Sequence, residues 1–143
     1  MKKWLVIPMM LITLSGCSLL DSVNQSLDYT QEAGTFINET SQFASSIPEL
    51  AKQAAKSAEA TEALNKELEE MKQRIADFNG IDAPAFADSI HEQLVGLNDT
   101  LLTDINGYMD QIQNGVTDIQ NSNIVQTVDK INETLDTIKN LQP

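Results

Sequence analysis

The segment from Leu50 to Phe78 has the clearest periodicity in the chain and constrains the fold most strongly. Apolar or small residues recur at alternating steps of four and three, at Leu50, Ala54, Ser57, Thr61, Leu64, Leu68, Met71, Ile75 and Phe78. Between them lie charged residues, which are Lys52, Lys56, Lys66, Glu67, Glu69, Glu70, Lys72 and Arg74. This pattern predicts an amphipathic helix with one stripe against a partner and a solvated outer face.

The preceding segment has a seven-residue recurrence in two adjacent rows, which are Val23, Thr30, Ile37 and Ala44, and Tyr29, Phe36, Phe43 and Leu50. Such a recurrence keeps one stripe facing a neighbouring helix. The sequence Ser46-Ile47-Pro48-Glu49 combines a capping box with a proline in the first turn. We therefore expect this helix to end near Ser45 and the next one to begin there.

Two more helices are expected in the remainder of the chain. Asn79-Gly80 should end the second helix with glycine in the left-handed conformation, and Asp82 should cap a third helix with Pro84 in its first turn. Its stripe runs from Phe86 to Ile119, roughly 50 Å of helix, so a break is expected near Gly96, Gly107 or Gly115. Asn121-Ser122-Asn123 should cap a last helix that begins at Ile124 and carries the stripe to Leu141.

Four amphipathic segments with short connections, and no competing strand pattern, predict an all-α fold. We expect an elongated antiparallel bundle of about four helices, coiled-coil-like, over residues 22–143.

The N-terminus predicts export and a lipid anchor. Lys2 and Lys3 precede an apolar run of 11 residues, from Trp4 to Leu14, which is too short to remain as a membrane span. The following Leu14-Ser15-Gly16-Cys17 resembles the lipobox of bacterial lipoproteins. That resemblance implies a signal peptide over residues 1–16, a diacylglyceryl group on Cys17 and a lipidated tether over residues 17–21. The alternative is an ordinary secretory signal, but Cys17 is the only cysteine and occupies the position that the lipobox requires.

Charge limits the partners of the mature chain. Without Lys2 and Lys3 it has 7 basic and 21 acidic side chains, a net charge of −14. This charge opposes binding to nucleic acid and to anionic lipid head groups. No lysine or arginine occurs between Arg74 and Lys130, where nine acidic residues occur. These acidic residues form either a solvated face or a surface for cations or a basic partner.

The search for catalytic or metal-binding residues gives no candidate. His91 is the only histidine, which excludes a multi-histidine metal site, and we expect it to be exposed or at the boundary of the core. Asp104-Ile105-Asn106-Gly107 resembles the start of a calcium loop, but its glycine comes too early and Tyr108 fills a ligand position. We therefore predict no enzymatic activity, no cofactor and no metal.

The whole chain also resembles a family of small uncharacterised lipoproteins from Bacillus-type Gram-positive bacteria. The resemblance rests on Cys17-Ser18-Leu19-Leu20, Leu27-Asp28-Tyr29, Glu69-Glu70-Met71-Lys72, and Ala83-Pro84-Ala85-Phe86-Ala87 followed by Ile90-His91. It implies anchoring on the extracytoplasmic face of the cell membrane. In a Gram-negative cell, Ser18 after the cysteine would direct the protein to the outer membrane.

Two functions follow as hypotheses. The favoured one is a non-enzymatic interaction or structural module that is held by its lipid and contacts a protein partner or itself through its helices. The alternative is a binding protein for a small apolar or cationic ligand, held in an interhelical cavity lined by Phe78, Phe86, Leu94 and Tyr108.

Overall fold

A computed structural model describes residues 17–139, and within this range it describes the side chains of residues 27–120, 122–134 and 137. The described backbone contains helices and loops and no strand. The elements are α1 (Cys17–Ala54), α2 (Ala58–Asn79), α3 (Asp88–Gln113), the short 3-10 helix η1 (Ile119–Asn121) and α4 (Ile124–Lys139). The predicted all-α fold of four helices is confirmed.

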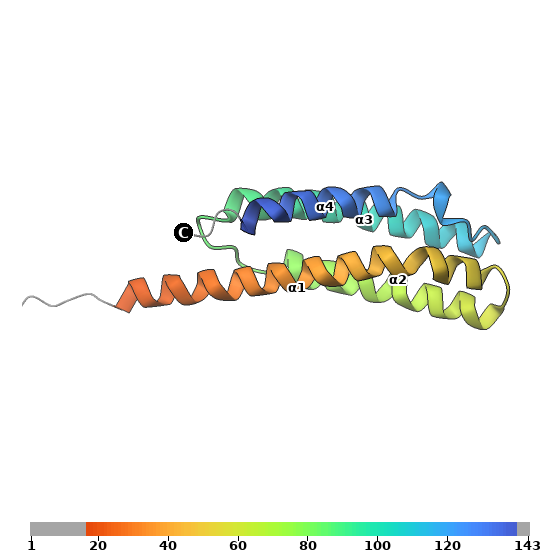
Figure 1. Cartoon of the computed structure of the whole chain (residues 1–143), viewed down its shortest axis with the longest axis horizontal. Coiled ribbons are helices and arrows are strands. Elements are labelled where there is room, and N and C mark those ends of the chain that lie inside the picture. Colours follow the sequence, from red (N-terminus) through yellow and green to blue (C-terminus); the bar gives the residue numbers. More distant parts are fainter. Residues whose placement is uncertain (1–16, 140–143) are drawn as a thin grey trace, which may run out of the picture.

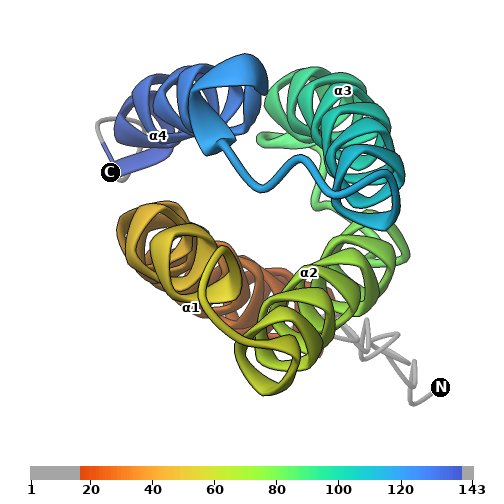
Figure 2. The ribbon, with the colours of Figure 1, turned by 90° about the vertical axis from the view of Figure 1, so that its right-hand side faces the viewer.

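The four helices run alternately up and down and form a ring when viewed along the bundle (Figures 1 and 2). Each helix packs against the next one in sequence, and α4 closes the ring by packing against α1. The bundle is elongated, and the N-terminal part of α1 projects beyond the other three helices (Figure 1). This projection includes residues 17–21, the stretch predicted as a tether, whose backbone belongs to α1.

The predicted stripes supply the core. In α2 all five apolar positions of the stripe are buried, namely Leu64, Leu68, Met71, Ile75 and Phe78. The same core contains three aromatic side chains of α1, namely Tyr29, Phe36 and Phe43. The other described stripe residues of α1 are only partly buried at the edge of the core, namely Thr30, Ile37, Ala44 and Leu50. Each Å² of apolar surface that is buried stabilises the fold by roughly 25 cal/mol, so burial of these side chains favours the packed ring. The side chain of Val23 lies outside the described set.

The predicted helix boundary at residues 45–48 is wrong, because α1 continues through Pro48 to Ala54. A proline inside a helix costs about 3 kcal/mol, since it removes one backbone hydrogen bond and crowds the preceding turn. Burial of Ile47, Ala51 and Ala54 continues the stripe across Pro48 and offsets this cost. The hydroxyls of Ser45 and Ser46 also donate to carbonyls of the preceding turn, at 2.8 and 3.0 Å.

The helix break comes instead at residues 55–57. Ser57, predicted to lie in the stripe, is exposed and is the N-cap of α2, because its side chain accepts a hydrogen bond from the backbone N–H of Ala60 at 3.1 Å. This cap satisfies one of the free amides at the start of the helix.

The connection between α2 and α3 differs from the prediction in two respects. Gly80 ends α2 as predicted, but its φ is −85°, so it does not adopt the left-handed conformation. The third helix begins at Asp88 rather than near Asp82 and Pro84. A turn in which the Ala87 amide donates to the Pro84 carbonyl buries Ala87 completely and leaves Phe86 46% exposed. Phe86 is therefore not part of the stripe.

The third segment breaks at the last of the three predicted glycines. Helix α3 ends at Gln113, and Gly115 has φ +80°. Val116 is exposed and Ile119 belongs to η1, so neither continues the α3 stripe. Helix α4 begins at Ile124 as predicted. Leu141 and the side chains of Leu135 and Ile138 lie outside the described residues.

Candidate functional site

An open groove of about 700 Å³ lies between α1 and α2, near the end of the bundle from which α1 projects (Figure 1). Its lining is Asp28, Gln31, Glu32, Thr35, Phe36 and Glu39 from α1, Arg74, Asp77 and Phe78 from α2, and Ile81 from the following loop. The groove thus combines four carboxylates and one guanidinium with three apolar side chains.

The floor of the groove is aromatic. The rings of Phe36 and Phe78 stack with their centroids 4.2 Å apart and an interplanar angle of 12°. Both side chains are buried, and Ile81 beside them is partly buried. Stacking joins α1 to α2 below the groove and fixes the position of the residues around it.

The rim of the groove is acidic. Asp28, Glu32 and Glu39 lie on one face of α1, because the intervals of four and seven residues return to the same side of a helix. Within the described part of the chain these three carboxylates form no ion pair. Asp77 faces them from α2 and accepts a hydrogen bond from the Gln73 amide at 2.8 Å.

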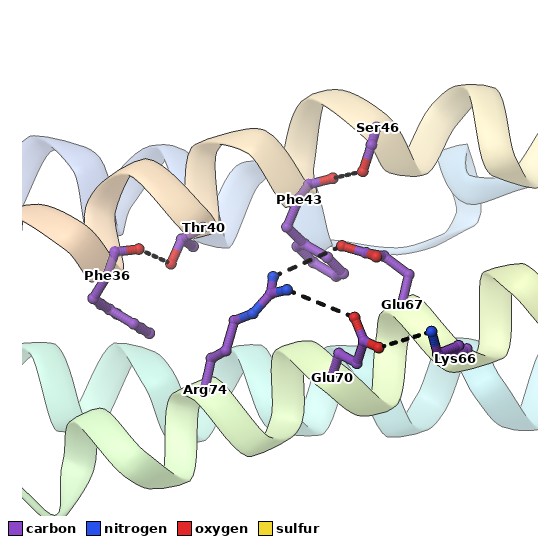
Figure 3. Close-up of polar contacts among 8 residues, drawn as sticks. All are labelled: Phe36, Thr40, Phe43, Ser46, Lys66, Glu67, Glu70 and Arg74. Atoms are coloured by element: carbon purple, nitrogen blue, oxygen red, sulfur yellow. Dashed lines mark hydrogen bonds and ion pairs between the residues drawn. The ribbon is translucent and has the colours of Figure 1, made fainter.

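Arg74 is the basic residue of the groove, and its charge is already shared with two glutamates of its own helix. Its Nη1 lies 3.8 Å from Glu67 Oε1 and its Nη2 lies 3.6 Å from Glu70 Oε2 (Figure 3). Glu70 also pairs with Lys66 Nζ at 3.2 Å. Such half-buried pairs at the surface contribute about 1 kcal/mol or less each, but they partly satisfy the guanidinium. The Arg74 guanidinium is therefore engaged within α2, and among the described side chains it forms no ion pair with the rim carboxylates.

A second hollow, of about 360 Å³, continues the groove along the same seam between α1 and α2. It is lined by Glu39, Gln42, Ser46, Leu50, Glu67 and Arg74. Glu39 and Arg74 border both hollows. We call the two together the α1/α2 furrow.

His91 is 8% exposed, so the prediction of an exposed or boundary histidine is wrong. Its Nδ1 lies 3.1 Å from the hydroxyl of Tyr29, and its ring packs against Phe78 with centroids 5.3 Å apart. Burial lowers the pKa of His91, while the nearby Asp88 carboxylate acts in the opposite direction. Burial also raises the pKa of Tyr29 to about 12. This pair bridges α1 and α3 within the core, and its described partners do not form a Ser/His/Asp arrangement.

The four residues predicted to line a ligand cavity do not come together. Phe78 lies under the furrow, whereas Phe86 is exposed in the loop before α3. Leu94 and Tyr108 are completely buried, and the Tyr108 hydroxyl donates to the Thr117 carbonyl at 2.6 Å. The carboxylates of α1 at residues 28, 32 and 39 were not predicted as a site, although their spacing is visible in the sequence.

Among the side chains that the structure describes, histidine, cysteine, aspartate and glutamate form no group of three that could hold a metal ion. Asp104, from the sequence that resembles a calcium loop, accepts a hydrogen bond from Thr127 of α4 at 2.7 Å. No helix in the described range is both long and apolar enough to cross a membrane. The side chain of Cys17 lies outside the described set.

The fold and the furrow define a four-helix bundle that carries an acidic groove on its surface. A family model described as "Family of unknown function (DUF6376)" matches residues 29–141, and the chain belongs to this family. The chain is also similar to the protein named Uncharacterized lipoprotein YybP of Bacillus subtilis (strain 168). The two are 33% identical over 134 residues, which cover 92% of this chain and 90% of the relative. This relative confirms the resemblance to small Bacillus lipoproteins. No solved structure gives a significant match.

Proposed function

We propose that the protein is a lipid-anchored extracytoplasmic bundle that acts as a non-enzymatic interaction module. The anchor is supported by Leu14-Ser15-Gly16-Cys17 and by the name of the Bacillus subtilis relative, which is called a lipoprotein. Two acyl chains on Cys17 would give stable membrane attachment, where one chain gives only marginal attachment. In a cell with a single membrane, the bundle would stand on its outer face.

The main support for the interaction role is the α1/α2 furrow. It places carboxylates that form no ion pair among the described side chains above an aromatic floor on the surface of the bundle. Polar groups around an apolar centre are the usual composition of a binding surface.

A second candidate function is the binding of a small cationic ligand. The first hollow favours it, because about 700 Å³ falls within the range of small-molecule sites. The site would then be the groove above Phe36 and Phe78, rather than a cavity inside the bundle.

The anchor is tested by labelling cells with a radioactive fatty acid and isolating the protein. We expect Cys17→Ala to lose the label and to leave the membrane fraction, because no other thiol is present to be acylated. Ser18→Ala is the matched control and should keep both. Undiminished label on Cys17→Ala would refute the anchor.

A further inference from the structure

The length of the α1/α2 furrow indicates the kind of ligand that it fits. From Asp28 to Leu50 the furrow follows α1 for 22 residues, roughly 33 Å at 1.5 Å per residue. Its two hollows meet at Glu39 and Arg74 and share one seam. A small molecule would fill only one hollow, whereas a helix of about 20 residues would fill both.

We propose that the furrow binds a basic amphipathic helix of a partner protein, an inference that rests on the proposed role as an interaction module. Apolar side chains of the partner would lie along the seam, against Ile81 at one end and Leu50 at the other. Its lysines or arginines would face the carboxylates of α1. This is the helix-in-groove mode of recognition.

The distribution of charge along the furrow indicates where the basic residues of the partner helix lie. The hollow that contains Asp28 is also lined by the acidic residues Glu32, Glu39 and Asp77, and Arg74 is the one basic residue among its described lining residues. The opposite end of the furrow is lined by the uncharged residues Leu50, Ser46 and Gln42. Glu67 also lies there, but its carboxylate pairs with Arg74. The basic residues of the partner therefore lie at the end from which α1 projects, and its more apolar half lies toward Leu50.

Charge also argues against a second copy of this chain as the occupant. The mature sequence has a net charge of −14, so two copies repel each other at an acidic furrow. In a second copy, α2 could offer Lys66, Lys72 and Arg74 to the furrow. Each of these side chains already pairs with a glutamate of α2. A separate, basic protein satisfies the furrow better.

The first test uses the full chain in a neutral detergent and a fluorescent 20-residue helical peptide of leucine and lysine, with leucines at helical spacing. We expect measurable binding by anisotropy. The furrow variant Asp28→Asn/Glu32→Gln/Glu39→Gln should bind roughly tenfold more weakly, which corresponds to about 1.4 kcal/mol. The control Asp99→Asn/Glu92→Gln/Glu133→Gln removes the same three charges from exposed positions of α3 and α4 and should change affinity less than about twofold.

Several outcomes of this titration would overturn the proposal. Equal loss in both triple variants would show non-specific attraction between charges. Equal binding of a scrambled peptide of identical composition would show that the amphipathic helix is not recognised. Full displacement of the peptide by a linear polyamine at equal concentration would favour the small-ligand function. Circular dichroism of each variant confirms that the bundle is intact.

A second test separates the furrow from the interaction role as a whole. A photoreactive residue is placed at Thr35, in the furrow, or at Gln93, exposed on α3, in living cells. The proposal predicts a cross-link at position 35 to a basic amphipathic segment identified by mass spectrometry. Cross-links only at position 93 would overturn the furrow but keep the interaction module, and none at either position would count against both.

Discussion

His91 packs between α1 and α2 from its place on α3, although a lone histidine on a helix beside Glu92 gives little sign of burial in the sequence. The hydroxyl of Tyr29 and the ring of Phe78 account for its position. A neutral imidazole fits this site because it forms one hydrogen bond with Tyr29 and packs against the ring of Phe78. A charged imidazolium loses hydration there, which explains why burial lowers its pKa.

We predict that this histidine makes the bundle less stable in mild acid. The unfolded chain binds a proton near the ordinary histidine pKa of about 6.5, whereas the folded chain binds it only at lower pH. Stability from His91 is therefore complete above pH 6.5 and falls as the pH drops below it. Urea unfolding at pH 7.5 and pH 5.5 should show a smaller fall in unfolding free energy for His91→Gln than for the natural chain. An equal fall in both would show that His91 is not responsible.

Among the elements, the end of α3 shows how one glycine sets a boundary that the hydrophobic pattern does not. Gly115 has φ +80°, which side-chain-bearing residues rarely adopt, whereas Gly107 lies inside the helix with open space around it. Gly115→Ala should cost about 1–2 kcal/mol, and the matched control Gly107→Ala should stabilise the protein by about 0.5–1 kcal/mol. Thermal melting followed by circular dichroism measures both. A lower midpoint for Gly107→Ala, or no change for Gly115→Ala, would contradict these assignments.

The elements that the sequence predicts well are those where a long apolar stripe decides the structure. The stripe from Leu64 to Phe78 is buried throughout, and α4 begins at its predicted residue. Local signals were less reliable, since Pro48 and the capping box before it suggested a break that burial of Ile47 and Ala51 overrides. The prediction that Phe86 begins the third stripe is wrong for the opposite reason. There a local turn at Pro84 overrides the apolar pattern and leaves Phe86 outside the helix.

The furrow could be predicted only in part. The spacing of Asp28, Glu32 and Glu39 places them on one face of a helix, and this much is readable from the sequence. Which side of α2 faces that row depends on the stacking of Phe36 on Phe78 between these two neighbouring helices. The hydrophobic periodicity of one helix does not specify which residues of another helix it contacts. The furrow is therefore visible only once the packing of α1 against α2 is known.

The whole molecule is longer than its chain length requires. Helix α1 has 38 residues in one element, roughly 57 Å from end to end, and it projects past the ring formed with the other three helices (Figure 1). With a lipid on Cys17, this projection would separate the acidic bundle from the head groups of the membrane. The furrow begins 11 residues after Cys17, roughly 16 Å along α1, so a lipid on Cys17 would place it within reach of a partner close to the membrane.

Small-angle scattering of the chain from Ser18 onward, without its lipid, tests the elongated bundle most directly. A compact domain of this length has a radius of gyration of about 14 Å. A rod built around an unbroken α1 should give roughly 18 Å or more, together with a strongly helical circular dichroism spectrum. A helical spectrum with a radius near 14 Å would contradict the account, because α1 would then have to break, for example at Pro48, and the continuous furrow along it would be lost.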